Sequence, residues 1–374
     1  MKLKSTLQWQ IGAAFIGTII GAGFASGQEI MFFFTQYGLP GSICMLLTGL
    51  VFSLLSYAVI YCSAYFSAHN YNDLINRLCG KRLALVYDII ISSFLFLGVS
   101  IMFSGSGAVF KENLGLPSFV GISLIAVFTL LVVFSSVKGI LRLNTVIVPI
   151  LIGIIVLIFC QSIGKLSVTD IVSHMNQIKP ESVHKPFFSF LFYCSYNVVL
   201  SIGVLSAFSE NIKDIGILKK GALIGGAGLM LLGSLQNICI AINAPNVFRY
   251  SIPMLYVIKQ YNVYFKYLVT ICIWCAVFTT AVSNLFSIVK RISRGQDSSY
   301  KLTAAIITAS CIPLSLYDFK KLVSFFYPLF GALSILLIAI LLITFIRLRF
   351  SAANSIVRKN SIVQGHPPSK LHPR

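Results

Sequence analysis

The residues most able to bind a ligand lie near the N-terminus, in the segment GTIIGAGFASGQEI at positions 17–30. Its polar residues Ser26, Gln28 and Glu29 follow two closely spaced glycines inside an otherwise apolar stretch. Because each glycine lowers helix stability by about 1 kcal/mol relative to alanine, we predict that the helix opens between Ile20 and Ser26. In lipid, opened backbone is tolerated only where protein or a watered cavity receives its polar groups. The segment therefore predicts a binding site within a membrane helix.

The two ends of such a break would bind opposite charges. The N-terminal end of the outer half-helix, near Ala22 to Ser26, directs free N–H groups and a positive dipole toward an anion such as a carboxylate. The C-terminal end of the inner half-helix, near Gly17 to Ile20, directs carbonyl oxygens toward a cation. The alternative is that the glycines only permit a close helix crossing, as in G-x-x-x-G packing. Packing alone does not account for the polar residues that follow, so we favour the break.

Glu29 lies well inside a predicted span, whereas Asp88 lies near the inner end of the third span. A charge at mid-bilayer costs about 2.5–3.5 kcal/mol on insertion scales, so such residues usually face a cavity. Gln28 and Glu29 are therefore candidates for gating or proton handling. The alternative for Glu29 is a solvated carboxylate in an outer vestibule.

The sixth apolar run is the second place where we predict a break. Its centre contains six polar or small residues: Tyr193, Ser195, Tyr196, Asn197, Ser201 and Gly203. Asn and Ser offer the backbone hydrogen bonds that compete with a helix. The alternative is an unbroken helix whose polar residues bond to neighbouring helices.

The eighth run carries a candidate cation site. Ala276, Thr279 and Thr280 stand at i, i+3 and i+4, so one carbonyl and two hydroxyls share a helix face. Oxygen ligands suit a hard cation such as sodium, and carbonyls from the first break would complete the set. The alternative is that both threonines bond back to their own helix.

Composition places these segments in a membrane protein. The chain is 57% hydrophobic and 10% charged, with a mean hydropathy of +0.89, which excludes an ordinary soluble domain. About 20 helical residues cross a bilayer, and the chain has ten apolar runs of about that length. They are 8–34, 40–66, 84–110, 117–136, 144–163, 186–208, 217–243, 263–289, 302–317 and 322–346. We predict an all-α polytopic membrane protein of about ten transmembrane helices, with the first run retained rather than removed as a signal peptide.

The net charge of +19 indicates how the chain is oriented in the membrane and does not indicate nucleic-acid binding. Twenty of the 29 Lys and Arg residues fall on the side of the N-terminus. The positive-inside rule then predicts a multi-pass protein of the cytoplasmic membrane, with both termini in the cytoplasm and basic residues near lipid headgroups. Residues 351–374 are polar and basic, which predicts a disordered cytoplasmic tail.

Motifs for other functions are missing from the sequence. It has no phosphate-binding loop, its histidines all lie between or after the apolar runs, and the Cys272/Cys275 pair falls in an apolar helix. We therefore expect no enzyme, no cofactor, and no metal beyond sodium. Five runs cover 8–163 and five cover 186–346 within one transmembrane domain, 1–350. An odd number of spans makes the second half enter the membrane from the opposite side, which predicts inverted repeats.

The segment GTIIGAGFASGQEI resembles the signature of the YkvI-type bacterial membrane proteins, a group of proposed amino-acid permeases. That group is similar to the wider LeuT-fold, or amino acid-polyamine-cation, superfamily, and YCSYN at 193–197 adds a less specific likeness. The resemblance implies two inverted five-helix repeats, LeuT-like, with helices 1 and 6 broken around a central substrate. It also implies that Ala22, Gly23 and Phe24 lie around the substrate carboxylate.

The candidate residues follow from these segments and from the resemblance. Candidates for the substrate are Ala22, Gly23, Phe24, Ala25, Ser26, Tyr193, Tyr196 and Asn197, and candidates for a cation are Gly17, Ile20, Ala276, Thr279 and Thr280. Many sodium-coupled relatives carry a gating arginine where this chain has Gln28 and Glu29, so the coupling ion stays open between sodium and a proton.

The expected function is secondary active transport of an amino acid or similar small zwitterion with a cation, by alternating access. The alternative is a non-transporting sensor or channel that retains the fold. The sequence has no continuous polar stripe that would favour a channel. It predicts no oligomeric state.

Overall fold

The computed structural model describes residues 2–68, 71–135, 138–164, 166–179, 182, 184–211, 214–293 and 297–363. These residues are helical almost throughout, and no strand occurs among them. The longer helices are α1 (Lys2–Ile19), α4 (Gly38–Phe66), α5 (Tyr71–Leu114), α6 (Ser118–Ser135), α7 (Lys138–Ile163), α9 (Lys185–Asn211), α10 (Ile215–Ala241), α12 (Val263–Ile292), α13 (Asp297–Ser315) and α14 (Phe319–Val363). The shorter elements are α2 (Ala22–Ala25), α3 (Gln28–Phe33), η1 (Thr35–Tyr37), α8 (Val168–Gln177), η2 (Asn246–Arg249), α11 (Pro253–Val257) and η3 (Ile258–Gln260).

The ten predicted apolar runs are helical over most of their described residues, which confirms the all-α class. By length and composition, six helices within the described residues can cross a membrane, or seven if α7 and α8 form one bent span. The apolar parts of α6 and α13 are shorter, at 118–134 and 300–315. The number of ten spans therefore stays a prediction.

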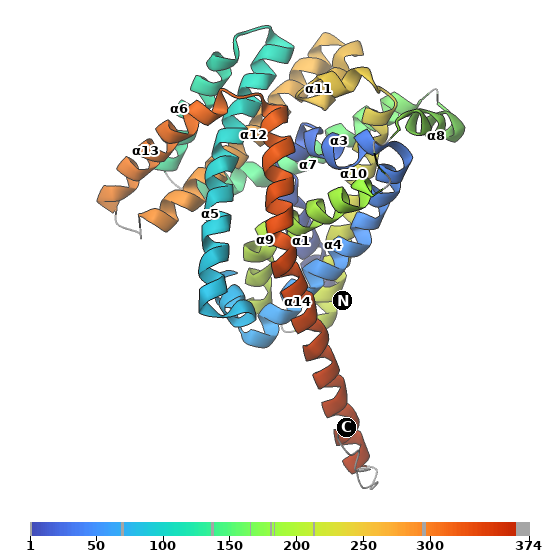
Figure 1. Cartoon of the computed structure of the whole chain (residues 1–374), viewed down its shortest axis with the longest axis vertical. Coiled ribbons are helices and arrows are strands. Elements are labelled where there is room, and N and C mark those ends of the chain that lie inside the picture. Colours follow the sequence, from blue (N-terminus) through green and yellow to red (C-terminus); the bar gives the residue numbers. More distant parts are fainter. Residues whose placement is uncertain are drawn as a thin grey trace.

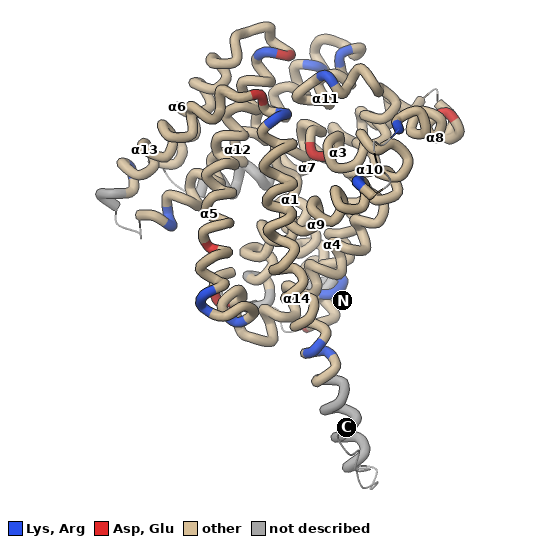
Figure 2. Tube along the Cα trace, viewed as in Figure 1, with Lys and Arg blue, Asp and Glu red and all other residues tan. Residues whose placement is uncertain are grey.

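Charged residues are distributed as a bilayer requires. Figure 2 shows Lys, Arg, Asp and Glu mostly toward two ends of the molecule, with few in the belt between. The N-terminus and the C-terminal half of α14 lie toward one end, while α8 and α11 lie toward the other (Figure 1). Helix α14 continues to Val363, so the predicted disordered tail is helical as far as that residue, and residues 364–374 lie outside the described ones.

The glycine-rich run of α10, residues 221–233, packs against α1 and α4. A Cβ atom added at Gly221 would lie 2.6 Å from Cβ of Ile11 in α1, and one added at Gly226 would lie 2.2 Å from Oγ of Ser53 in α4. No larger residue fits at these contacts without a shift of the helices. The glycines thus let the helices approach closely, as small residues do in membrane interfaces.

Two surface segments lie at the end of the molecule opposite the N-terminus. Helix α8 is bent by 98° from α7 and begins with a capping box between Ser167 and Asp170. The second segment consists of three short helical pieces, η2, α11 and η3. The N–H of Met254 in α11 donates to the carbonyl of Ser26 at 3.1 Å. This bond joins α11 to the turn between α2 and α3.

Candidate functional site

The predicted break in the first span is present, since α1 ends at Ile19 and α2 begins at Ala22. The N–H of Gly21 donates to the carbonyl of Ile19 at 2.7 Å, and the N–H of Ala22 donates to the hydroxyl of Thr280 at 3.3 Å. A continuous helix would direct each N–H to the carbonyl four residues earlier. The carbonyl of Gly17 therefore loses its helical donor at the break.

A second turn follows within six residues and redirects the chain. Gly27 separates α2 from α3 with a φ of 78°, a value that favours glycine. The hydroxyl of Ser26 donates to the carbonyl of Gly23 at 3.0 Å and accepts from the N–H of Gln28 at 3.3 Å. These bonds hold the turn in shape, and the Glu29 side chain that follows it lies back against Gly23.

The carboxyl group of Glu29 lies directly over Gly23. A Cβ atom added at Gly23 would lie 1.9 Å from Oε1 of Glu29 and 2.7 Å from its Cδ. Oε2 of Glu29 accepts a 2.8 Å hydrogen bond from the hydroxyl of Tyr196 in α9. Glu29 is 5% exposed, so the interpretation as a solvated vestibule carboxylate is wrong.

A cavity of about 1010 Å³ adjoins the break. Its wall is built by α1, α2, α5, α7, α9, α12 and α14 together with Glu29 of α3 and Ile224 of α10. The polar side chains on the wall include Thr18, Glu29, Tyr196, Asn197, Thr279, Thr280, Ser283, Asn284, Ser287 and Tyr327. Among the described residues that line it, Glu29 is the acidic one and there is no Lys, Arg or His.

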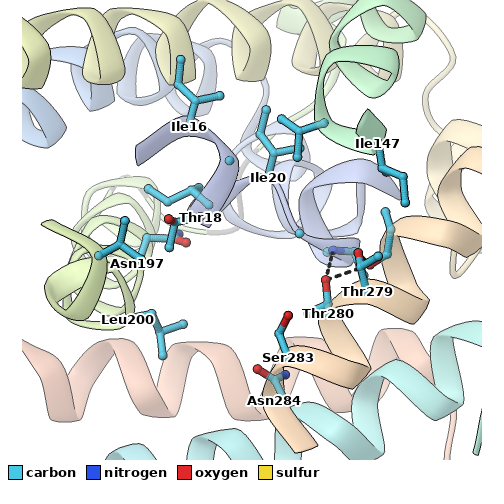
Figure 3. A pocket seen from close by; sticks show the side chains of 18 of the residues that line it. Ile16, Thr18, Ile20, Ile147, Asn197, Leu200, Thr279, Thr280, Ser283 and Asn284 are labelled. Carbon is cyan, nitrogen blue, oxygen red and sulfur yellow. Dashed lines mark hydrogen bonds between the residues drawn. The ribbon is translucent and has the colours of Figure 1, made fainter. Parts of the chain in front are cut away.

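Many of the predicted site residues meet at this cavity. Those on its wall are Gly17, Ile20, Ala22, Gly23, Glu29, Tyr196, Asn197, Ala276, Thr279 and Thr280. Figure 3 shows Asn197 of α9 and Thr280 of α12 on different sides of the cavity, with Ile20 at the break. Segments from the first, sixth and eighth runs are thus neighbours, although they lie far apart in the chain.

Five predicted residues are buried away from the cavity: Phe24, Ala25, Ser26, Gln28 and Tyr193. Helix α2 has four residues, and only its first two reach the cavity wall. The carbonyl of Phe24 instead accepts from the side-chain amide of Gln236 at 3.0 Å. The ring of Tyr193 packs on Phe33, Phe34 and Phe52, with centroids 5.4, 4.9 and 5.8 Å away.

The predicted break in the sixth run is wrong. Helix α9 is continuous from Lys185 to Asn211. The side-chain amide of Asn197 donates to the carbonyl of Tyr193 at 3.0 Å, and the hydroxyl of Ser201 donates to the carbonyl of Asn197 at 2.7 Å. These polar groups bond to carbonyls of their own helix without displacing its N–H groups, so the helix does not open.

The two threonines of α12 donate hydrogen bonds to a carbonyl of their own helix, which was the alternative to a cation site in the sequence analysis. The hydroxyls of Thr279 and Thr280 donate to the carbonyl of Ala276 at 3.2 and 2.8 Å. The hydroxyl of Thr280 also accepts from the N–H of Ala22, which fixes α12 against the break. The donor set at this point consists of carbonyl and hydroxyl oxygens, which is the chemistry that a hard cation needs.

Ser283 and Asn284 line the cavity but were not among the predicted site residues. They lie four residues after Thr279 and Thr280, so the same helical spacing could have identified them. Phe94 of α5 and Tyr327 of α14 also line the cavity. Aromatic residues are so frequent in this chain that neither gave a signal of its own.

Solved transporter structures share this fold. The chain superposes on Mhp1 in an inward-facing conformation with a TM-score of 0.65 at 10% identity, over 87% of this chain and 73% of that one. For MhsT in complex with L-phenylalanine the TM-score is 0.60 at 14% identity, over 83% and 79%. For a Na⁺-coupled sialic acid symporter in a substrate-bound outward-open state it is 0.60 at 14% identity, over 88% and 76%. These similarities show a helical fold of the LeuT type.

Sequence comparison identifies relatives over nearly the whole chain, although no protein-family model matches. The YyaD protein of Bacillus subtilis (strain 168) is 27% identical over 347 residues, which are 92% of this chain and 98% of that protein. The membrane protein YkvI of the same organism is 30% identical over 336 residues, 89% of this chain and 94% of the relative. This identity over nearly the full length of both proteins shows that the chain belongs to the family of the YkvI membrane protein.

Proposed function

We propose that the chain is a secondary active transporter that moves an amino acid or a similar small zwitterion by alternating access, coupled to sodium or to protons. The observation that carries the proposal is the cavity at the break of the first span. It combines freed backbone groups, a buried carboxylate and neutral polar side chains within a belt that has few charges. Unwound backbone that faces a cavity at membrane depth is typical of transporter substrate sites.

In the proposed cycle, this state is open at the end of the molecule that holds the N-terminus. Trp9 lines the cavity there and is 64% exposed. Beyond Glu29, in the opposite direction along the first span, Phe33, Phe34 and Tyr193 are fully buried and pack together. Alternating access then requires a second state in which this aromatic cluster separates and the end near Trp9 closes.

Cation coupling is supported by two groups of atoms on the cavity wall. The carbonyl of Gly17, freed at the break, and the oxygens around Thr279 and Thr280 have the chemistry for sodium. Glu29 is the group that could carry a proton instead. Coupling through either group would link substrate binding to the ion gradient.

Uptake by proteoliposomes tests the proposal. The purified chain is reconstituted, and uptake of radiolabelled amino acids is measured under an imposed sodium gradient, an imposed proton gradient, or neither. We expect one gradient to drive accumulation and Asn197→Ala to reduce it. Gly203→Ala is the matched control on the same helix, because a Cβ atom there meets nothing within 4 Å. Ligand binding without gradient-driven uptake would favour the non-transporting sensor.

A further inference from the structure

The space over Gly23 already contains a carboxyl group of the chain itself. Oε1 of Glu29 lies where a Cβ atom of Gly23 would stand, and Oε2 is held by the Tyr196 hydroxyl. When Glu29 is ionised, a substrate carboxylate bound at this backbone would lie beside a second carboxylate in a site of low dielectric, where like charges repel strongly. The site next to Glu29 therefore favours a positively charged ligand group over a negatively charged one.

Aromatic rings next to Glu29 point to the same charge. Phe94, Tyr196 and Tyr327 come from α5, α9 and α14, and all three line the cavity. The ring of Tyr196 lies 6.2 Å from that of Phe94 and 5.3 Å from that of Tyr327, centroid to centroid. Aromatic rings attract ammonium groups through their quadrupoles, most strongly where water is displaced. Carboxylate and rings together form a site suited to an organic cation.

The rest of the described wall does not offset this negative charge. It carries no Lys, Arg or His, and its other polar side chains, such as Asn197, Ser283 and Asn284, are neutral. A ligand carboxylate would have no basic side chain to pair with among the described lining residues. An ammonium group would have Glu29 as its counter-ion.

We infer that the Glu29 end of the cavity binds an organic ammonium group, so that the ligand is a primary or substituted amine whose carboxylate, where it has one, is dispensable. The inference rests on the proposed function only in taking this cavity as the substrate site. It reverses the orientation that the sequence predicts, in which the substrate carboxylate faces Ala22, Gly23 and Phe24.

Equilibrium binding to the purified full chain in detergent tests the inference. The ligands are matched triplets that share a side chain: leucine, isoamylamine and 4-methylvalerate, and phenylalanine, phenethylamine and 3-phenylpropionate. We expect each amine to bind at least as tightly as its amino acid, and each carboxylic acid to bind about tenfold more weakly or worse, as loss of a charge-assisted contact predicts. Equal binding of amine and acid, or no binding by any of the six, would overturn the inference.

Variants assign the preference to one residue. Glu29→Gln removes the charge and should reduce amine affinity about tenfold, with no loss for the acids. Glu29→Asp retains the charge and should keep the amine preference, which covers the case in which Glu29→Gln does not fold. Asp170→Asn, a matched change of an exposed carboxylate on α8, should change neither. An unchanged amine-to-acid ratio in Glu29→Gln would contradict the assignment.

Transport measurements separate this inference from the proposed function. Amines that bind through Glu29 but do not accumulate in proteoliposomes under any gradient would refute transport and leave the amine site standing. Gradient-driven accumulation of the carboxylic acids, with no preference for amines, would refute the amine site and leave transport standing.

Discussion

Substitution of Gly23 by alanine should break the contact at the centre of the site. The added Cβ atom would lie 1.9 Å from Oε1 of Glu29, 2.7 Å from Cδ and 2.8 Å from Cγ. Because three successive atoms of the side chain are too close, rotation of the terminal oxygens alone cannot relieve the overlap. The carboxyl group must move away, and its 2.8 Å hydrogen bond with Tyr196 is then lost.

The expected cost follows from these two effects. A hydrogen bond to a charged group contributes about 1.5–3 kcal/mol, and overpacking of a buried site costs about 1–3 kcal/mol. The two partly overlap, since moving Glu29 relieves the overlap by giving up the bond. We therefore expect Gly23→Ala to lower the free energy of unfolding by about 2–4 kcal/mol, with about 0.5–1 kcal/mol returned by the better helix propensity of alanine.

A double-mutant cycle measures this coupling directly. The apparent free energy of unfolding in mixed micelles is compared for the parent chain, Gly23→Ala, Glu29→Ala and the double variant. With the Glu29 side chain removed, Gly23→Ala should cost less than about 0.5 kcal/mol. Gly203→Ala serves as a control without contacts. A cost of Gly23→Ala that is the same with and without the Glu29 side chain would refute the reasoning.

Three further predictions concern single groups. Thr280→Val removes the hydroxyl that accepts the Ala22 N–H bond. It should raise the sodium concentration for half-maximal uptake about tenfold, and Thr280→Ser should restore the wild-type concentration. If Thr280→Val keeps the sodium dependence of the wild type, a sodium site at Thr280 is excluded. The buried hydroxyl of Tyr193 has no hydrogen-bond partner among the described residues. Tyr193→Phe should therefore leave the free energy of unfolding unchanged or raise it by about 1 kcal/mol, and a clear drop in melting temperature would contradict this. Hydrogen bonds from the helix cap lower the pKa of Asp170 on the exposed helix α8, so the stabilisation is present above the usual aspartate pKa and is lost as pH falls through the lowered one. Hydrogen exchange over Val168–Gln177 should therefore lose protection only in acid, and Asp170→Asn should abolish that acid step.

Local chemistry explains which parts of the fold the sequence predicts. Composition and the length of the apolar runs decide the membrane class, because a bilayer core accepts a chain whose backbone hydrogen bonds are satisfied internally and whose side chains are apolar, as in a long apolar helix. The break after Ile19 is also predictable, since closely spaced glycines weaken one turn of helix. The face shared by Ala276, Thr279 and Thr280 follows from helical spacing alone.

The sixth run shows where such local reasoning fails. Helix α9 contains Asn197, Ser201 and Gly203 but stays continuous, because its polar side chains bond carbonyls and leave the N–H ladder intact. The first span opens because Thr280, from a distant helix, accepts the N–H that the break releases from Ala22. A break therefore needs a partner as well as a weak sequence, and only the tertiary structure supplies one.

Glu29 shows most clearly which properties the sequence determines and which depend on the tertiary structure. The sequence alone determines that a costly acidic residue lies in a membrane helix beside a glycine-rich break. Its position over Gly23, its bond to Tyr196 at a separation of 167 residues, and the neighbouring rings of Phe94 and Tyr327 depend on how α3, α5, α9 and α14 pack. The charge that the cavity presents to a ligand is a sum over these helices, which no local pattern in the chain specifies.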